Sequence, residues 1–221
     1  MTTGARQNGR WLRRVMLVAP FAPGGIMVRV LLLAPPGAGK GTQGSLLSDR
    51  FEIPHLATGD LFRRHIAEAT PVGVEAKAYV DVGRLVPDDL VTDLVISTLD
   101  TDPPLEGFIL DGFPRTLAQA RVAYEWARST GRTFTAVIML EVPGGELVSR
   151  LVERGRQSGR SDDSLDVIHH RLRVYATHTA PLIDFYEARG ILHRVDGTGT
   201  IGVVAQRINH ELTQAGLASS S

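Results

Sequence analysis

A glycine-rich turn that ends in a lysine is the first feature of this sequence with residues suited to chemistry. Its residues are Gly37, Ala38, Gly39, Lys40, Gly41 and Thr42, preceded by two prolines. Because glycine lacks a Cβ, the backbone N–H groups of such a turn can point inward and surround phosphate oxygens. The lysine ammonium can then reach terminal phosphates, and the threonine hydroxyl can lie near Mg²⁺. The alternative is a glycine-rich turn that binds no ligand.

The segments on either side of this turn fit a phosphate site. Residues 28–34 form an apolar run with one charge, which is typical of a buried parallel strand, and residues 40–51 indicate a helix. A helix that begins at the turn directs the positive end of its dipole toward a bound anion. Ala34 departs from the general pattern, because a glycine usually stands there. Pro35 biases Ala34 toward an extended conformation that alanine can adopt, so we expect phosphate binding to persist.

An acid and an arginine follow a second short apolar run. Residues 107–110 are apolar and continue into Asp111, Gly112 and, three residues later, Arg115. In open α/β sheets, ligands bind beyond the carboxyl ends of the strands, which is where these side chains are expected. Asp111 can orient the water ligands of Mg²⁺, and Arg115 can bind a phosphate. Gln119 follows one helical turn later and offers both a hydrogen-bond donor and an acceptor.

Two further segments contain candidate binding residues. Thr58 begins a predicted helix and Arg63 lies about one turn into it. Leu85 and Val86 offer apolar contact just before a Pro-Asp-Asp helix start at residues 87–89. The alternatives are a capped helix with an exposed arginine in the first case and an ordinary helix start in the second.

Arginines are concentrated around two glycines near residue 155. They are Arg150, Arg154, Arg156 and Arg160, and Arg171 follows on the next predicted helix. Like charges this close repel one another unless an anion arrives, which favours a polyphosphate site. The alternative is a solvated basic loop whose charge is partly offset by Glu153, Asp162 and Asp163.

In their order along the chain, these motifs resemble those of the adenylate kinase family. The Gly-Lys-Gly-Thr-Gln form of the turn at residues 39–43 is typical of nucleoside monophosphate kinases, and the resemblance covers residues 27–215. It implies that ATP is bound by Gly37, Ala38, Gly39, Lys40, Gly41, Thr42, Arg150 and Arg154. It implies that AMP is bound by Thr58, Arg63, Leu85, Val86, Gly112, Arg115, Gln119, Arg160 and Arg171. The implied catalytic residues are Lys40, Arg115, Arg150, Arg160 and Arg171, and Thr42 and Asp111 would hold Mg²⁺ through water.

The activity that this resemblance implies is a reversible, Mg²⁺-dependent phosphoryl transfer from ATP to AMP that gives two ADP. Positioning and charge stabilisation supply most of the catalysis of such a reaction, so we expect no general base. In the related UMP/CMP kinases, alanine usually stands at the position of Thr58 and asparagine at that of Gln119, so both residues here favour adenine. A kinase for another nucleoside monophosphate and an inactive nucleotide-binding relative stay open as alternatives. A GTPase-type switch is disfavoured, because the chain lacks an Asn-Lys-x-Asp motif.

Composition restricts the other classes of function. The chain has 221 residues, no cysteine and a formal net charge of +0, and 43% of its residues are hydrophobic. A disulfide-stapled fold and thiolate metal sites are thereby excluded, and bulk charge gives no reason to expect nucleic acid or a membrane as partner. We expect a cytoplasmic monomer whose partners are ATP and AMP.

The elements that must position these residues alternate between strands and helices, which predicts an α/β P-loop NTPase fold with a parallel sheet of about five strands and helices on both faces. Strands are predicted over residues 28–34, 107–110, 134–142 and 191–195, and helices over 40–51, 118–129, 146–153, 164–189 and 201–214. The resemblance adds a helical AMP-binding insertion at 58–87 and a short lid at 154–163.

The two ends of the chain differ from the rest. Residues 1–26 contain four arginines and no acid, and end in a Pro/Gly-rich stretch before Met27. This segment is interpreted as a disordered extension or as the product of a misassigned start, with Met27 as the true one. A targeting peptide and a basic arm are the alternatives. Residues 216–221 are expected to form a C-terminal tail.

Overall fold

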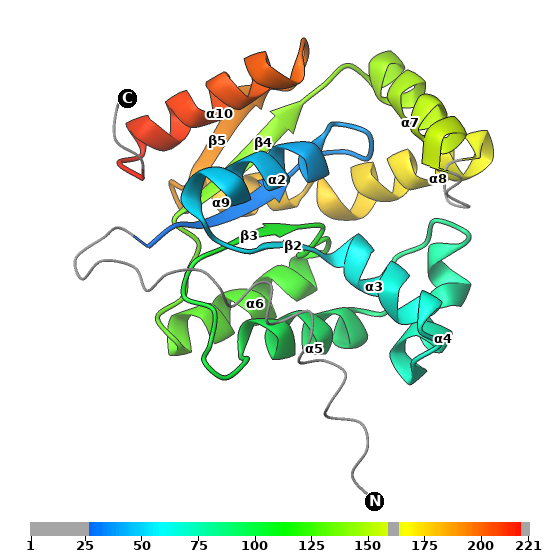
Figure 1. Cartoon of the computed structure of the whole chain (residues 1–221), viewed down its shortest axis with the longest axis horizontal. Helices are drawn as coiled ribbons and strands as arrows, with labels where there is room; N and C mark the ends of the chain where they lie inside the picture. Colours follow the sequence, from blue (N-terminus) through cyan, green and yellow to red (C-terminus); the bar gives the residue numbers. More distant parts are fainter. Residues whose placement is uncertain (1–26, 159–163, 218–221) are drawn as a thin grey trace, which may run out of the picture.

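A computed structural model describes residues 27–158 and 164–217, which form a five-stranded parallel sheet covered by helices (Figure 1). The strand order is β2-β3-β1-β4-β5, and every neighbouring pair is parallel. The strands are β1 (Arg29–Leu33), β2 (His55–Ala57), β3 (Phe108–Asp111), β4 (Ala136–Glu141) and β5 (Leu192–Asp196). The predicted fold class is confirmed.

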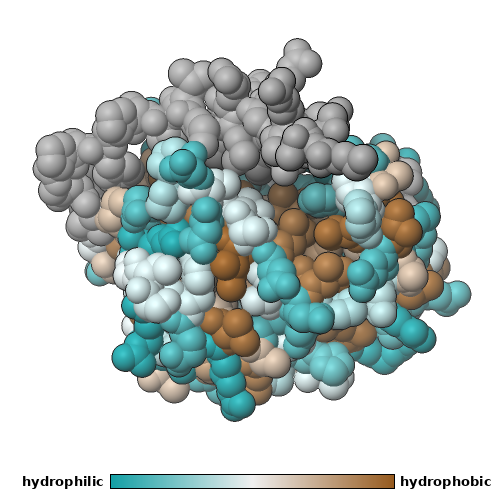
Figure 2. All heavy atoms as spheres, turned by 90° about the horizontal axis from the view of Figure 1, so that it is seen from below, coloured by the Kyte–Doolittle hydropathy of each residue, from teal (hydrophilic) through white to brown (hydrophobic). Residues whose placement is uncertain are grey.

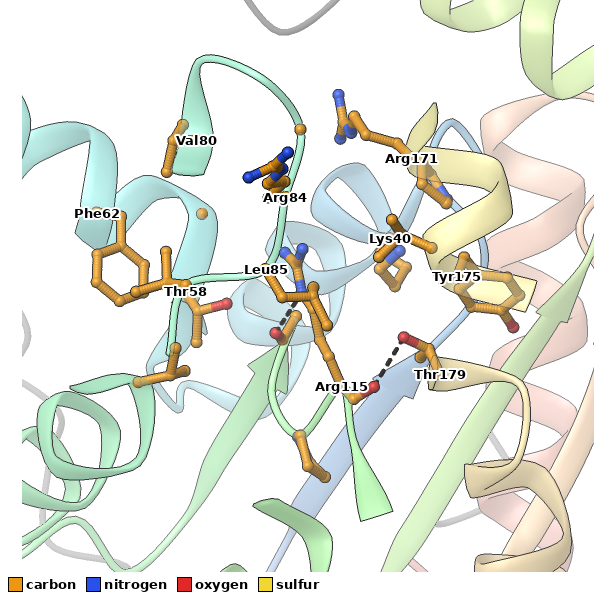
Figure 3. Close-up of a pocket in the computed structure, with 18 of the residues that line it drawn as sticks. Lys40, Thr58, Phe62, Val80, Arg84, Leu85, Arg115, Arg171, Tyr175 and Thr179 are labelled. Atoms are coloured by element: carbon orange, nitrogen blue, oxygen red, sulfur yellow. Dashed lines mark hydrogen bonds between the residues drawn. The ribbon is translucent and has the colours of Figure 1, made fainter. Parts of the chain in front are cut away.

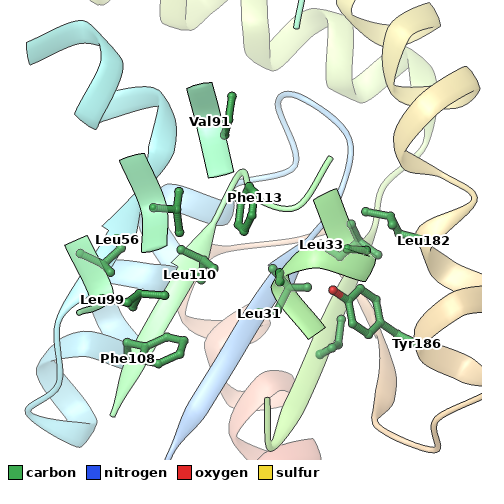
Figure 4. Packing of buried hydrophobic residues seen from close by; sticks show 14 of the residues in the cluster. Leu31, Leu33, Leu56, Val91, Leu99, Phe108, Leu110, Phe113, Leu182 and Tyr186 are labelled. Atoms are coloured by element: carbon green, nitrogen blue, oxygen red, sulfur yellow. The ribbon is translucent and has the colours of Figure 1, made fainter. Parts of the chain in front are cut away.

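Strand β1 lies at the centre of the sheet and contributes to a core on each face. Successive side chains of a strand point to opposite faces, so Leu31 and Leu33 join one core while Val30 and Leu32 join the other. All five residues of β1 are buried. This explains why the sequence shows a continuous apolar run here instead of an alternating pattern. Figure 4 shows the first core, in which Leu31 and Leu33 lie near Tyr186.

Helices cover both faces of the sheet. The first core is closed by α5 (Asp88–Leu99), α6 (Leu117–Ser129) and α9 (Leu182–Glu187), and the second by α2 (Lys40–Phe51) and α10 (Ile201–Gln214). In the view of Figure 2, from the side of α5 and α6, polar residues lie around and between groups of apolar residues, as expected for amphipathic helices that cover a sheet. In the part of the chain that the structure describes, no helix is long and apolar enough to cross a membrane.

Four helices lie beyond the carboxyl ends of the strands. Helices α3 (Thr58–Ala67) and α4 (Pro71–Val80) pack on each other, as do α7 (Gly144–Ser158) and α8 (Leu165–Val174). The α3–α4 contact is close, because a Cβ added at Gly73 would lie 2.0 Å from the backbone oxygen of His65. Thr70 fixes the turn between them by accepting a hydrogen bond from Gly73 N at 3.1 Å.

The structure differs from the predicted elements in four places. Helix α5 has 12 residues, although only its start at residues 87–89 is predicted. Strand β2 has only three residues and no predicted counterpart. The single helix predicted over 164–189 is divided into α8, a π-helical turn (Tyr175–Thr179) and α9. Pro181, immediately before α9, explains the division, because proline has no N–H and its ring clashes with the carbonyl four residues earlier. Helix α7 continues to Ser158, so Arg154 and Gly155 are helical.

Several expectations fall on residues 1–26, 159–163 and 218–221, which lie outside the described residues. These include the N-terminal extension, the second half of the predicted lid with Arg160, and the end of the C-terminal tail. The packed part of the chain continues past residue 215, since Leu217 is buried against the second core.

Candidate active site

The glycine-rich turn connects β1 to α2 and is packed too tightly at Gly37 to hold a side chain. Gly37 and Gly39 have φ angles of +86° and +93°, in the left-handed region that favours glycine. A Cβ at Gly37 would lie 2.9 Å from both the backbone oxygen of Leu147 and the Cγ of Leu151. Helix α7 therefore packs directly on the turn. Helix α2 begins at Lys40, immediately after Gly39, so its positive end faces the turn.

Lys40 lies inside this turn in an enclosed, electropositive position. Its Nζ donates hydrogen bonds to the backbone oxygens of Ala34 at 2.8 Å and Pro35 at 3.3 Å. Burial is the main cause that lowers the pKa of Lys40 to about 8, and the nearby carboxylate of Asp111 only partly opposes it. The positive charges that add to the lowering are those of Arg115, Arg171 and Arg154. An anion placed among these groups would stabilise the charged lysine.

Asp111 is the last residue of β3 and lies beside the turn. The strand register pairs it with Leu32 of β1 and with Ala57 of β2. Thr42 is exposed in the first turn of α2. A carboxylate and a hydroxyl are the hard oxygen ligands that Mg²⁺ prefers, and Mg²⁺ commonly keeps several waters and takes few protein ligands. The described residues contain no cluster of three or more His, Asp or Glu side chains that could hold a metal ion. The oxygen chemistry of Thr42 and Asp111 suits Mg²⁺ that keeps several of its waters.

A cavity next to Lys40 brings together every predicted acceptor-site residue within the described part of the chain. These residues are Thr58, Arg63, Leu85, Val86, Gly112, Arg115, Gln119 and Arg171. They come from α3, the segment before α5, the turn after β3, α6 and α8. Figure 3 shows Thr58 and Phe62 on one side of the cavity and Lys40 and Arg171 on the other.

Thr58, Gly112 and Arg115 are packed against one another at the carboxyl edge of β3. Gly112 has a φ angle of +83°, and a Cβ there would lie 2.5 Å from Thr58 Oγ1 and 3.0 Å from Arg115 Nη2. The Thr58 hydroxyl donates to the backbone oxygen of Asp111 at 3.2 Å. Arg115 Nε donates to the backbone oxygen of Gly112 at 2.7 Å. The absence of a side chain at Gly112 is what allows the two polar groups to approach.

The backbone of Arg115 is held from two further sides. Its N–H donates to Gln119 Oε1 at 2.7 Å, and its carbonyl accepts a hydrogen bond from Thr179 Oγ1 at 2.9 Å (Figure 3). Thr179 is buried at the end of the π-helical turn, and Tyr175 at its start also lines the cavity. Sequence reasoning identified neither residue. Arg84, Val80 and Phe62 are further cavity residues that it did not assign.

The remaining acceptor-site residues lie on α3 and in the segment before α5, and this segment packs on α8. Arg63 forms an ion pair with Asp60 on α3. Val86 is buried in the first core, and Leu85 beside it projects toward the cavity in Figure 3. A Cβ at Gly83 would lie 2.8 Å from Arg171 Cγ, so the segment before α5 packs on α8.

Helix α7 carries the arginines that were predicted to bind ATP. Arg150 is paired with Glu146 and donates to the backbone oxygen of Gly197 at 3.1 Å. Arg154 follows four residues later on the same helix face and is near enough to lower the pKa of Lys40. Arg156 is exposed and lies 3.8 Å from Glu153. Arg150 and Arg154 do not line the acceptor cavity. The donor arginines predicted on α7 thus lie outside the cavity that contains the acceptor residues.

Comparison with known proteins identifies the family of this chain. Residues 32–191 match the family model described as "Adenylate kinase". An adenylate kinase of a Nocardioides species is 44% identical over 181 residues, which cover 82% of this chain and 95% of that protein. The adenylate kinase of Kocuria rhizophila is 46% identical over 182 residues, or 82% of this chain and 97% of that protein. The adenylate kinase of Mycobacteroides abscessus is 46% identical over 185 residues, which cover 84% of this chain and 99% of that protein. With a family match over most of its length and relatives this similar, the chain belongs to the adenylate kinase family.

Proposed function

We propose that this protein is an adenylate kinase that transfers the γ-phosphoryl group of ATP to AMP and gives two ADP. The observation that carries the proposal is the cavity beside Lys40, which is lined by all eight described residues of the predicted acceptor site. The lysine at the end of the glycine-rich turn and the acceptor residues therefore share one site. Membership of the adenylate kinase family supports the same reaction.

On the donor side, the backbone N–H groups of the turn bind the ATP phosphates. These groups belong to Gly37, Ala38, Gly39, Lys40, Gly41 and Thr42, and Arg150 and Arg154 on α7 complete the donor site. Thr42 and Asp111 would hold Mg²⁺ through water, and the bound ion would supply positive charge at the phosphate oxygens. The lid comprises residues 154–163, and its first residues are the last turns of α7.

On the acceptor side, Arg63 and Arg115 bind the AMP phosphate. Leu85 and Val86 contact the adenine, and Thr58 and Gln119 recognise its polar edge. Gly112 allows the close approach described above. Helices α3 and α4 belong to the acceptor-binding insertion at 58–87, which the structure connects to the core through β2 and α5.

The transfer needs no general base, because the AMP phosphate is already anionic. One of its oxygens attacks the γ-phosphorus in line, and the bond from that phosphorus to the β–γ bridging oxygen breaks with its electrons going to the leaving ADP. Lys40, Arg115, Arg150, Arg160 and Arg171 stabilise the charge that is spread over the transferring group. We place the protein in the cytoplasm as a monomer.

The decisive experiment is steady-state ADP formation with Mg·ATP and AMP, UMP, CMP or GMP as acceptor. We expect rapid turnover with AMP alone. Lys40→Ala and Arg115→Ala should each lower turnover by roughly 10²-fold or more, as loss of a charge-stabilising group does. Arg121→Ala, an exposed arginine of α6, is the matched control and should keep normal turnover.

The other possible outcomes of this experiment lead to different conclusions about the site. Near-normal turnover in both variants would contradict the assigned site. Preference for another acceptor would keep the mechanism and change the base assignment. A folded protein without turnover on any acceptor would support the inactive nucleotide-binding relative.

A further inference from the structure

We propose that Asp88 determines the base specificity of the acceptor site by fixing the orientation of the Gln119 side-chain amide. The inference rests on the proposed function, in which Gln119 recognises the base. Asp88 is the first residue of α5, and Gln119 lies in the first turn of α6. Gln119 lines the cavity and is 2% exposed, whereas Asp88 is not among the cavity residues. Asp88 is therefore a positioning residue that acts through Gln119.

The Gln119 amide is held at both of its ends. Its Nε2 donates to Asp88 Oδ1 at 2.8 Å, and its Oε1 accepts a hydrogen bond from the backbone N–H of Arg115 at 2.7 Å. The second oxygen of Asp88, Oδ2, accepts from the Thr116 hydroxyl at 2.7 Å. Thr116 Oγ1 in turn accepts from Gln119 N at 3.1 Å, which closes a ring of hydrogen bonds between the starts of α5 and α6.

The chemistry of the two partners permits one orientation of this amide. A carboxylate has no proton to donate, so the group that faces Asp88 must be the NH₂. A backbone N–H can only donate, so the group that faces Arg115 must be the amide oxygen. A reversed amide would place two acceptors together at one end and two donors at the other. Buried polar groups without partners are costly, so the reversed amide is strongly disfavoured.

This fixed orientation matches one class of purine. Each end of the amide keeps one unused position, namely the second N–H of Nε2 and the second lone pair of Oε1. Adenine presents an amino donor at C6 and an acceptor at N1, which suits this pair. Hypoxanthine and guanine present a carbonyl acceptor at C6 and an N–H donor at N1. The amide oxygen would then face an acceptor and the amide N–H would face a donor, so neither hydrogen bond could form. Asp88 thereby selects 6-aminopurine over 6-oxopurine nucleotides.

Asp88 is itself firmly placed. It follows Pro87 at the start of α5, and its backbone oxygen accepts a hydrogen bond from Thr92 Oγ1 at 2.6 Å. The neighbouring Asp89 is exposed, and its carboxylate accepts from Leu90 N at 2.9 Å. Asp88 and Asp89 therefore carry the same charge at the same helix end, while only Asp88 contacts Gln119.

The test compares AMP with inosine monophosphate (IMP), which differs from AMP only at N1 and C6 of the base. We measure kcat/KM for both nucleotides with the full chain and Mg·ATP. Asp88→Ala should lower kcat/KM for AMP about 10-fold and raise the IMP/AMP ratio at least ~10-fold, because a wrongly paired polar group costs on this order. Asp88→Asn keeps an acceptor oxygen and should stay near the wild-type ratio. Asp89→Ala, the matched control, should leave the ratio unchanged.

A double-mutant cycle separates positioning from general damage to α5. Gln119→Leu removes the amide and should abolish most of the preference for AMP over IMP. Adding Asp88→Ala to Gln119→Leu should then leave the IMP/AMP ratio unchanged, because coupled residues are non-additive. If Asp88→Ala does not fold, Asp88→Ser keeps a favourable helix-start residue with a side chain too short to hold Gln119, and should change the ratio in the same direction.

Equal losses with AMP and IMP in Asp88→Ala would overturn the inference, since a merely structural role lowers both alike. A further change of the ratio when Asp88→Ala is added to Gln119→Leu would also overturn it. Equilibrium binding of AMP and IMP without ATP provides the same ratio independently of catalysis. A wild-type chain that binds AMP well but IMP equally well refutes the inference alone, whereas a chain that neither binds nor phosphorylates AMP refutes the proposed function as well.

Discussion

At Lys40, the proposed role in activity conflicts with the stability of the fold. It lies among basic groups inside the glycine-rich turn, and burial lowers its pKa from 10.5 to about 8. Below pH 8 both the folded and the unfolded chain carry the charged lysine, so the folded chain bears the full cost of burying it. Between pH 8 and 10.5 the unfolded chain binds more protons, and the stability of the wild type therefore rises with pH.

Replacement of this lysine should stabilise the protein while inactivating it. We expect Lys40→Met to raise the free energy of unfolding at pH 7 by about 1–3 kcal/mol. The gain should shrink as the pH rises from 8 toward 10, because the wild type then loses its penalty. Urea denaturation at several pH values measures both effects. Lys77→Met is the matched control, since Lys77 is an exposed lysine paired with Asp81 and should change stability by less than about 0.5 kcal/mol. A less stable Lys40→Met variant at pH 7 would contradict the argument.

Sequence analysis found the candidate residues that belong to short local motifs. It missed residues that reach the site only through contacts with residues far away in the sequence. The loop from Gly37 to Thr42 and the turn from Asp111 to Arg115 carry their residue types in a fixed local order. Thr179 meets Arg115 across 64 positions of sequence, through a π-helical turn that no periodicity predicts. The partnership of Asp88 with Gln119 likewise depends on how α5 packs on α6. The binding roles of the motif residues stay predictions.

At the scale of elements, the π-helical turn joins α8 to the acceptor site. Its last residue, Thr179, donates to the backbone oxygen of Arg115, and α8 itself carries Arg171 at the cavity. A π-helical turn widens the helix locally, and such turns often occur at functional sites. The turn thus connects the helix that carries Arg171 to the backbone of Arg115.

Loss of the Thr179 hydroxyl should weaken the acceptor site selectively. Thr179→Val keeps the shape but leaves the Arg115 carbonyl without this donor. We expect kcat/KM for AMP to fall about 10-fold, mainly through KM for AMP, with KM for ATP nearly unchanged. Thr179→Ser should restore most of the loss, and Thr177→Val, in the exposed part of the same turn, should resemble wild type. Equal behaviour of the Ser and Val variants would show that the hydroxyl is unimportant.

The contact between α3 and α4 allows a second test at this scale. A methyl group at Gly73 would meet the backbone of His65 at 2.0 Å, so Gly73→Ala must push the two helices apart. We expect it to lower the free energy of unfolding by about 1–3 kcal/mol and to raise KM for AMP. Gly202→Ala in α10 meets nothing within 4 Å and should stabilise by about 0.5–1 kcal/mol. Urea denaturation distinguishes the two, and an unchanged Gly73→Ala variant would refute the tight packing.

The alternating pattern of long elements was sufficient to predict the fold class, but short elements escaped detection. Strand β2 has three residues, and α3 begins at the next one, so neither a period of two nor a bounding turn is visible. The division of residues 164–189 has a local cause in Pro181, whereas the π-helical turn before it has no evident local signal. The predicted end of α7 at residue 153 was too early, because the helix continues through Gly155 to Ser158.

At the scale of the whole molecule, Lys40 lies beside both predicted groups of binding residues. The acceptor cavity is lined by residues of α3, of the turn after β3 and of α8, while α7 packs on the glycine-rich turn and carries the arginines of the proposed donor site. In the proposed function, the two substrates therefore contact different sets of elements around one lysine.

This division predicts separate responses to the two substrates. AMP alone should slow amide hydrogen exchange in residues 58–67 and 112–119, because bound contacts reduce local opening. Residues 144–158 should exchange at their ligand-free rate until ATP is added. Mass spectrometry of peptides from the full chain measures both regions at once. Protection of residues 144–158 by AMP alone would contradict two separate binding regions.

The central position of β1 has a consequence for the synthesis of the protein on the ribosome. This strand, apolar except for Arg29, is made before any of its neighbours, since its partners begin at Phe108 and Ala136. Chains are synthesised at about 5–20 residues per second, so β1 stays without a neighbouring strand for several seconds. An unpaired apolar strand is prone to aggregate over that time. We therefore expect the nascent chain to depend on chaperone shielding of β1 until β3 and then β4 emerge.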